Sequence, residues 1–221
     1  MDRTKPIPSY LANRYRGWRA TSFADNEVWY KRLALEGQTP QAMVIACCDS
    51  RVTVESIFVA DAGEFFIHRN IANLVPPYRP ESDLAGTSAA IEYAVKILKV
   101  AHIIVLGHSR CGGVEACYNS CASGEPAGGG KLDFVDAWLD ILRPRYAHLP
   151  DADEEVRRAA FEHEAVLASI TNLLTFPFVE QAVADKKLVL HGAWIDIADG
   201  TLLTYDGAAH AFSSASKAKV D

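Results

Sequence analysis

Two short apolar runs, set among segments with helical spacing, constrain the fold of this chain most strongly. They are "AMVIACC" (42–48) and "HIIVLGH" (102–108), and each has the length of one strand. Continuous apolar runs of this length are typical of strands covered on both faces of a parallel sheet. Residues 83–100 and 112–121 carry the spacing expected of helices. The alternation predicts an α/β fold, with a central mainly parallel sheet flanked by helices.

The rest of the chain continues this pattern, and its length of 221 residues favours a single domain. A further strand is expected at "EFFIHRN", starting at Glu64, and two more near the end, joined by a turn at Ala198–Gly200. Further helices are expected over residues 24–37, 132–142 and 154–174.

The composition narrows the class of partner and compartment. The formal net charge is −6, which argues against nucleic acid and anionic membranes, since both favour a basic surface. The apolar runs are far shorter than the roughly 20 residues that span a membrane. The first residues, "MDRTKPIPSYL", contain no apolar signal segment. The five cysteines are an odd number, so metal binding or catalysis in the reducing cytoplasm is favoured over a disulfide framework.

Potential metal ligands follow both of the buried strands. Cys47, Cys48 and Asp49 end the first, and His108 and Cys111 end the second. The carboxyl ends of parallel strands meet at one edge of a sheet, where α/β proteins commonly bind ligands. Two thiolates and one imidazole with an open fourth position form a catalytic zinc pattern. The residues therefore favour a zinc site at this edge.

Three simpler interpretations remain open on the residues alone. A buried free cysteine is often just a small apolar side chain. The adjacent Cys47 and Cys48 could form a redox pair, although neighbouring cysteines bridge only with strained geometry. Asp49 and Arg51 could be an ordinary ion pair at the end of a strand.

Longer motifs around these residues resemble the β-class carbonic anhydrases. "CCDSRV" fits Cys-x-Asp-Ser-Arg, and "GHSRCGG" fits His-x-x-Cys-Gly-Gly. "GEFFIHRNIAN" (63–73) and "AAIEYAV" (89–95) also match. The resemblance implies a zinc lyase that reversibly hydrates carbon dioxide to bicarbonate and a proton through a zinc-bound hydroxide. One zinc per chain would be held by Cys47, His108 and Cys111, with Cys48 as a bystander.

The same resemblance implies roles for other residues and a shared active site. Asp49 and Arg51 match the catalytic dyad of the family. In the family, the amide and the aromatic side chains of the substrate pocket come from the neighbouring subunit, so a homodimer or larger homo-oligomer is expected. The chain would divide into an N-terminal helical arm that packs on the partner (1–36), a catalytic core (37–205) and a C-terminal tail (206–221). The matching substrate-pocket residues are Gln38, Phe66, Ile71 and Tyr93.

Some family members are regulated by bicarbonate, and this chain departs from their pattern. Their second pocket is built from a Trp, an Arg and a Tyr; here Arg69 is present, but Val44 and Ile195 occupy the other positions. Apolar side chains cannot donate hydrogen bonds to a buried anion, so an open-site, non-regulated subtype is predicted.

Two other functions remain as alternatives to carbon dioxide hydration. One is a zinc hydrolase of the same fold acting on a molecule such as carbon disulfide, and the other is a non-catalytic zinc or thiol module that senses redox state.

Overall fold

The computed structural model describes residues 4–81, 85–127, 129–130 and 132–215. The chain forms two compact units, an N-terminal one that ends at Thr39 and a main one that begins at Pro40. The predicted division into an arm, a core and a tail stays a prediction.

The N-terminal unit consists of two helices that bury none of their own residues. Helix α1 (Ser9–Trp18) continues through a π-helical turn (Arg19–Phe23), and α2 (Glu27–Glu36) follows. A helix over 24–37 was expected, and α2 ends before Gly37, whose φ of +82° suits a glycine at a helix end. The unit's rings contact one another, with centroids 5.2–6.1 Å apart, among Tyr15, Trp18, Phe23 and Tyr30.

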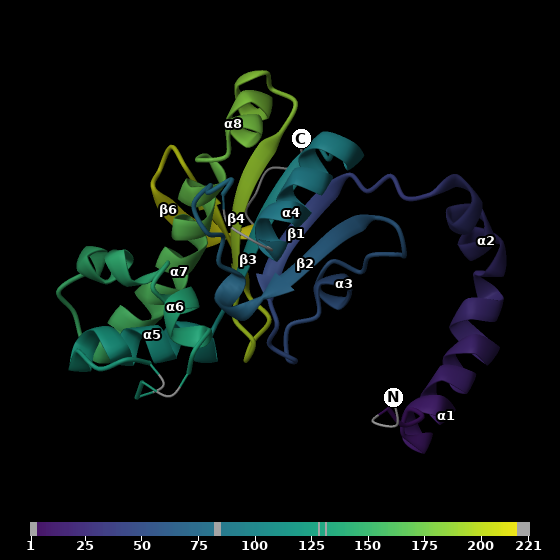
Figure 1. Ribbon diagram of the computed structural model, residues 1–221, viewed down its shortest axis with the longest axis horizontal. Helices are drawn as coiled ribbons and strands as arrows, with labels where there is room; N and C mark the ends of the chain where they lie inside the picture. Colours follow the sequence, from purple (N-terminus) through teal and green to yellow (C-terminus); the bar gives the residue numbers. More distant parts are fainter. Residues whose placement is uncertain (1–3, 82–84, 128, 131, 216–221) are drawn as a thin grey trace. The chain divides into compact units, whose positions relative to one another are not determined.

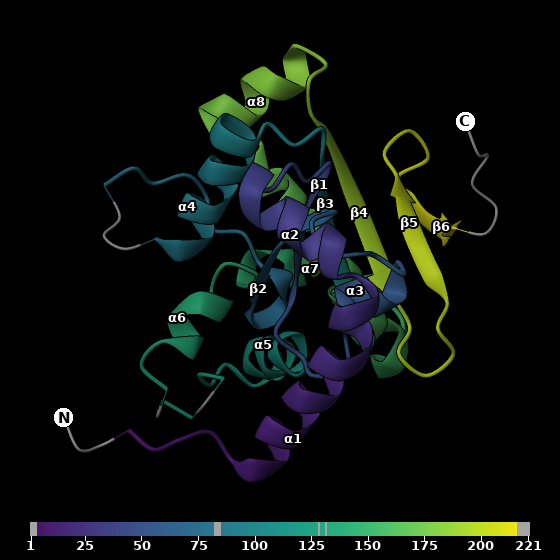
Figure 2. The ribbon, with the colours of Figure 1, turned by 90° about the vertical axis from the view of Figure 1, so that its right-hand side faces the viewer.

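The main unit is built on one six-stranded sheet with the order β2-β1-β3-β4-β5-β6. Figure 1 shows β2, β1, β3 and β4 side by side. The first four strands in this order are parallel, and the last two form an antiparallel edge, seen at one side of Figure 2. The predicted α/β fold with a mainly parallel sheet is thus confirmed. The strands are β1 (Ala42–Cys47), β2 (Phe65–Asn70), β3 (His102–His108), β4 (Val189–Ile195), β5 (Leu202–Asp206) and β6 (Ala211–Ser214).

Alternate residues of the central strands face two different apolar clusters. Ile45 and Val105 pack with residues of α7 (Glu154–Leu173) and α8 (Pro177–Ala184). Val44 faces the opposite cluster. The burial of β1 on both sides explains its continuous apolar sequence. The remaining helical elements are α3 (Val54–Ile57), Ile71–Asn73, α4 (Gly86–Glu92), Tyr93–Leu98, α5 (Gly112–Ser123), α6 (Val135–Leu139) and Arg143–His148.

Several expected boundaries need correction. The helix expected over 132–142 is the shorter α6, which is followed by a turn rather than further α-helix. The helix expected over 83–100 spans Gly86 to Leu98 among the described residues, and it changes from α to π at Tyr93; residues 83 and 84 lie outside that set. Strand β6 was not among the expected strands.

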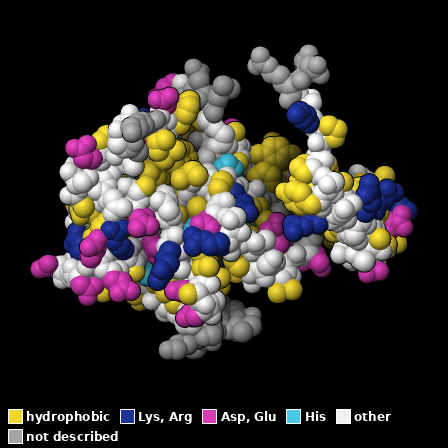
Figure 3. Space-filling model, turned by 90° about the horizontal axis from the view of Figure 1, so that it is seen from below, with side chains coloured by type: hydrophobic (Ala, Val, Ile, Leu, Met, Phe, Trp, Pro, Cys, Tyr) yellow, Lys and Arg dark blue, Asp and Glu magenta, His cyan; other side chains and the backbone are white. Residues whose placement is uncertain are grey.

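The longer helices and one face of the surface bear on the question of membrane contact. In the described part of the chain, no single helix is long and apolar enough to cross a membrane; α7 and α8 meet the criterion as a pair, but they are bent by 89°. On the face drawn in Figure 3, basic and acidic side chains are interspersed, with hydrophobic side chains between them.

Candidate metal centre and active site

The sheet brings together the three predicted metal ligands. Strands β1 and β3 are neighbours and pair in parallel up to Ala46 and Leu106. Cys47 ends β1, His108 ends β3, and Cys111 precedes the first turn of α5. Their donor atoms lie within 4.8 Å of one another, and all three side chains are buried. The topology of the sheet therefore forms the cluster from residues far apart in the chain.

The geometry of this cluster fits a tetrahedral metal ion. The two sulfur atoms of Cys47 and Cys111 are 3.8 Å apart. Two zinc–sulfur bonds of about 2.3 Å at a tetrahedral angle would separate the sulfurs by about 3.8 Å. The Nδ1 of His108 donates to the Ser109 carbonyl at 2.9 Å, so Nε2 carries the free lone pair. That Nε2 is buried and has no hydrogen-bond partner, and a metal ion would satisfy it.

The two thiols influence each other's ionisation. A hydrogen bond from Cys111 lowers the pKa of the Cys47 thiol, although burial opposes this. The same contact, together with burial, raises the pKa of Cys111. A metal ion that binds both sulfur atoms would require both thiols to lose their protons.

Asp49 is held beside the cluster by Arg51. The Nε and Nη2 atoms of Arg51 donate to the two carboxylate oxygens at 2.9 and 2.7 Å, and its backbone N–H donates to Oδ1 at 2.9 Å. These bonds hold the pKa of Asp49 well below its usual range. The Oδ2 of Asp49 lies 4.0 Å from the Nε2 of His108. An ionised carboxylate is therefore fixed next to the candidate metal position.

The loop that carries Cys111 has its own support. The Nη2 of Arg51 donates to the Arg110 carbonyl at 3.0 Å, which links this loop to the one after β1. The backbone N–H of Arg110 donates to Glu162, whose other oxygen accepts from Trp194 at 3.2 Å. Burial raises the pKa of Glu162. Sequence reasoning missed Glu162, because its partners lie far away in the chain and no local spacing marks it.

The predicted substrate-pocket residues fall into different places. Ile71 directly follows Asn70, which pairs with Cys47, so Ile71 lies at the metal end of the sheet. The Phe66 and Tyr93 rings stack with centroids 5.8 Å apart. Phe66 pairs with Met43, four residues before Cys47, which is about 13 Å along the strand. The structure therefore brings Ile71, but not Phe66, to the metal end of its own chain.

Two predicted residues lie outside this geometry. Gln38 belongs to the N-terminal unit, and its side chain is exposed. Cys48 is also exposed and contributes no atom to the metal cluster. Its position fits the expectation that Cys48 is a bystander.

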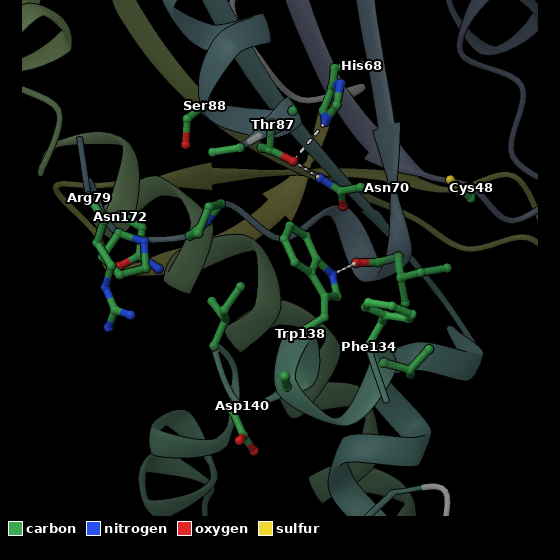
Figure 4. Close-up of a pocket in the computed structure, with 18 of the residues that line it drawn as sticks. Cys48, His68, Asn70, Arg79, Thr87, Ser88, Phe134, Trp138, Asp140 and Asn172 are labelled. Atoms are coloured by element: carbon green, nitrogen blue, oxygen red, sulfur yellow. Dashed lines mark hydrogen bonds between the residues drawn. The ribbon is translucent and has the colours of Figure 1, made fainter. Parts of the chain in front are cut away.

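A cavity of about 1170 Å³ opens beside the end of β2 (Figure 4). Cys48, Asn70 and Ile71 form part of its wall. Trp138 reaches across from α6, and its Nε1 donates to the Ile71 carbonyl at 2.8 Å. On the opposite wall, His68 bonds to Thr87 at 3.0 Å. The cavity thus offers space for a small molecule next to the residues that follow β1 and β2.

Comparison with known proteins assigns the family. The sequence model described as carbonic anhydrase matches residues 42–202, so the chain belongs to the carbonic anhydrase family. A Pseudomonas aeruginosa carbonic anhydrase is 39% identical over 186 residues, which are 84% of this chain and 81% of that protein. Beta carbonic anhydrase 3 of Arabidopsis thaliana is 37% identical over 188 residues, which are 83% of this chain and 71% of that protein.

Solved structures agree with this assignment and place the chain in the β class. The β-carbonic anhydrase CcaA superposes with a TM-score of 0.82 at 29% identity, covering 96% of this chain and 93% of that one. One of two tetrameric β-carbonic anhydrases from Sordaria macrospora gives a TM-score of 0.76 at 33% identity, covering 89% of this chain and 95% of that one. The chain is a β-class carbonic anhydrase.

Proposed function

We propose that this enzyme hydrates carbon dioxide at one zinc ion per chain, held by Cys47, His108 and Cys111. The observation that carries the proposal is the buried cluster of two thiols and one unpartnered imidazole nitrogen, with Asp49 fixed beside it. Two thiolates would cancel the double charge of zinc, and the third ligand is neutral. The site would then keep one open position for the reaction.

The chemistry of the zinc ion, Asp49 and Arg51 assigns a separate role to each. Zinc, when bound, supplies a nucleophile from water by lowering the pKa of that water. Asp49 is ionised and can only accept hydrogen bonds, so it selects an O–H group of the reacting species in one orientation. Arg51 keeps Asp49 ionised and aimed through two parallel hydrogen bonds. Bicarbonate, which carries one O–H, would be bound in the same orientation.

The substrate pocket is proposed to lie between two subunits. Carbon dioxide has no net dipole, so an apolar wall formed by Ile71 of the same chain suits it. Phe66 and Tyr93 stack well away from their own metal end, and Tyr93 is 45% exposed. We infer that this pair, together with Gln38, completes the site of a partner subunit in a homodimer or larger assembly.

The N-terminal unit supports the same inference. Its helices α1 and α2 contain no buried residue, and they expose large apolar side chains. Isolated helices of this length are marginal in water, so they need a surface to pack against. A second copy of the chain would provide it. The exposed side chains are Tyr10, Leu11, Tyr15, Trp18, Val28, Trp29 and Leu35.

The structure also supports the open-site subtype. Val44 is fully buried in an apolar cluster that includes Ile195. Trp194 points to the other side of the sheet, where it bonds to Glu162. No donor from either strand position therefore joins Arg69, so we propose that bicarbonate has no second pocket here.

One sample, tested for metal and for activity, decides between the candidate functions. Zinc content near one per chain together with rapid hydration of carbon dioxide is expected. Carbon disulfide hydrolysis without carbon dioxide hydration would favour the related hydrolase, and bound zinc without either activity would favour a redox-sensing module.

The proposed compartment is a reducing one such as the cytoplasm, because it would keep the five free cysteines as thiols.

A further inference from the structure

Arg69 contacts the loop that carries both a proposed zinc ligand and the proposed catalytic aspartate. It lies on β2, next to the end of β1. Its Nε donates to the Cys47 carbonyl at 2.9 Å. Its Nη2 donates to the carbonyls of Asp49 and Val52, at 2.7 and 2.8 Å. One guanidinium group therefore binds three backbone carbonyls within a single turn of chain.

This arrangement requires the shape of an arginine side chain. The guanidinium is planar and always charged, and it carries five donors in a fixed fork. A lysine ammonium is a point charge on a flexible stem, so its donors are not fixed in the directions of the three carbonyls. Hydrogen bonds from a charged donor are also stronger than those between neutral groups. Arg69 thus restrains the backbone of residues 47–52 as one body.

Arg69 and Arg51 bind different groups of Asp49. Arg51 binds the carboxylate of Asp49, and Arg69 binds its carbonyl oxygen. The carboxylate lies 4.0 Å from the Nε2 of His108. A shift of this backbone would therefore move the carboxylate relative to the metal ligands.

We propose that Arg69 is a positioning residue for the hydration reaction: it fixes the distance between Asp49 and the metal ligands by clamping the backbone between them. It acts through Asp49 and touches neither carbon dioxide nor the metal ligand atoms. The proposal rests on the proposed function for its effect on catalysis, but its effect on the loop is independent of that function.

The loop is tested first, by amide hydrogen exchange of the full-length protein as purified. Cys48, Arg51 and Val52 each have a bonded backbone N–H in this loop. Arg69→Gln should speed exchange in the peptide that spans residues 47–53 and leave α7 unchanged. Arg158→Gln is the matched control, because Arg158 also makes several side-chain hydrogen bonds, but to Glu115, Asn119 and Glu154. Unchanged exchange in the Arg69 variant would overturn the proposal.

The effect on catalysis is tested in two backgrounds. A misplacement of about 1 Å can cost on the order of 100-fold in rate, so Arg69→Gln should lower kcat by roughly that factor while zinc content stays near one. In the Asp49→Asn background, the same substitution should cost little more, since Arg69 acts through Asp49. Arg69→Lys should recover part of the rate. An equal loss in both backgrounds would show a merely structural role.

The outcomes separate this proposal from the proposed function. A wild-type protein that binds zinc but does not hydrate carbon dioxide would refute the function, whatever the exchange result. Active wild-type protein with unaltered loop exchange in Arg69→Gln would refute the clamp alone. If Arg69→Gln does not fold, Arg69→Lys carries both measurements.

Discussion

Gly107 precedes His108 on β3, and replacing it by alanine should destabilise the protein in a calculable way. A Cβ at this position would lie 2.7 Å from the Cγ2 of Val166 and 3.4 Å from the Cδ1 of Trp194. Optimal carbon–carbon separations are about 3.5–4.0 Å, so the Val166 side chain, or α7 with it, must shift by about 1 Å. Overpacking of this kind typically costs about 1–3 kcal/mol. The free energy of unfolding should fall by that amount.

The contact with Val166 provides the test. Stability is measured by urea unfolding at fixed protein and zinc concentrations. The double variant Gly107→Ala/Val166→Ala should lose about 1 kcal/mol less unfolding free energy than the sum of the losses in the two single variants. The reason is that the shortened side chain at 166 makes room for the new methyl group at 107. Gly112→Ala is the matched control, since a Cβ there meets nothing within 4 Å, and it should change stability by less than about 0.5 kcal/mol. Strictly additive costs, or a Gly107→Ala variant as stable as wild type, would refute the steric reasoning.

Three further predictions concern the metal, the aspartate and pH. Cys47→Ser should lose zinc, measured by atomic absorption, whereas Cys48→Ser should retain it; the reverse result would shift the ligand assignment by one residue. Asp49→Asn should retain zinc but lose most hydration activity in a stopped-flow assay, because an amide also donates hydrogen bonds; full activity would remove Asp49 from the mechanism. Burial lowers the pKa of His163 to about 4, so the unfolded chain takes up this proton first, and stability should fall between about pH 6.5 and 4. His163→Phe should lose less stability over this range in urea unfolding, and an identical decline in both proteins would contradict this reasoning.

The sequence predicts the parts of the fold that depend on local patterns. Strands β1 and β3 are evident because burial on both faces leaves a continuous apolar run. Strand β6 escaped notice because it is only four residues long and lies at the sheet edge. Helix α6 was predicted too long, since the apolar residues at 141 and 142 belong to a turn rather than to the helix.

The candidate site divides in the same way. The ligand cluster was predictable because each ligand adjoins the end of a recognisable strand, and parallel strands end at one edge. Arg69 and Glu162 bond to backbone atoms of loops that are remote in the chain. Backbone carbonyl and N–H groups are present in those loops whatever the side chains are. The residue pattern of the loops therefore does not predict these contacts.

The separation of the ligands along the chain has a consequence for how the enzyme matures. Cys47 and Cys111 are 64 residues apart, and they meet only when β1 and β3 pair. During synthesis, a chain that has not yet reached β3 offers neither His108 nor Cys111, so it holds zinc poorly. A chain that has passed the start of α5 contains every ligand, although β4 to β6 are still to be made. Zinc uptake during translation would therefore report when the centre of the sheet forms.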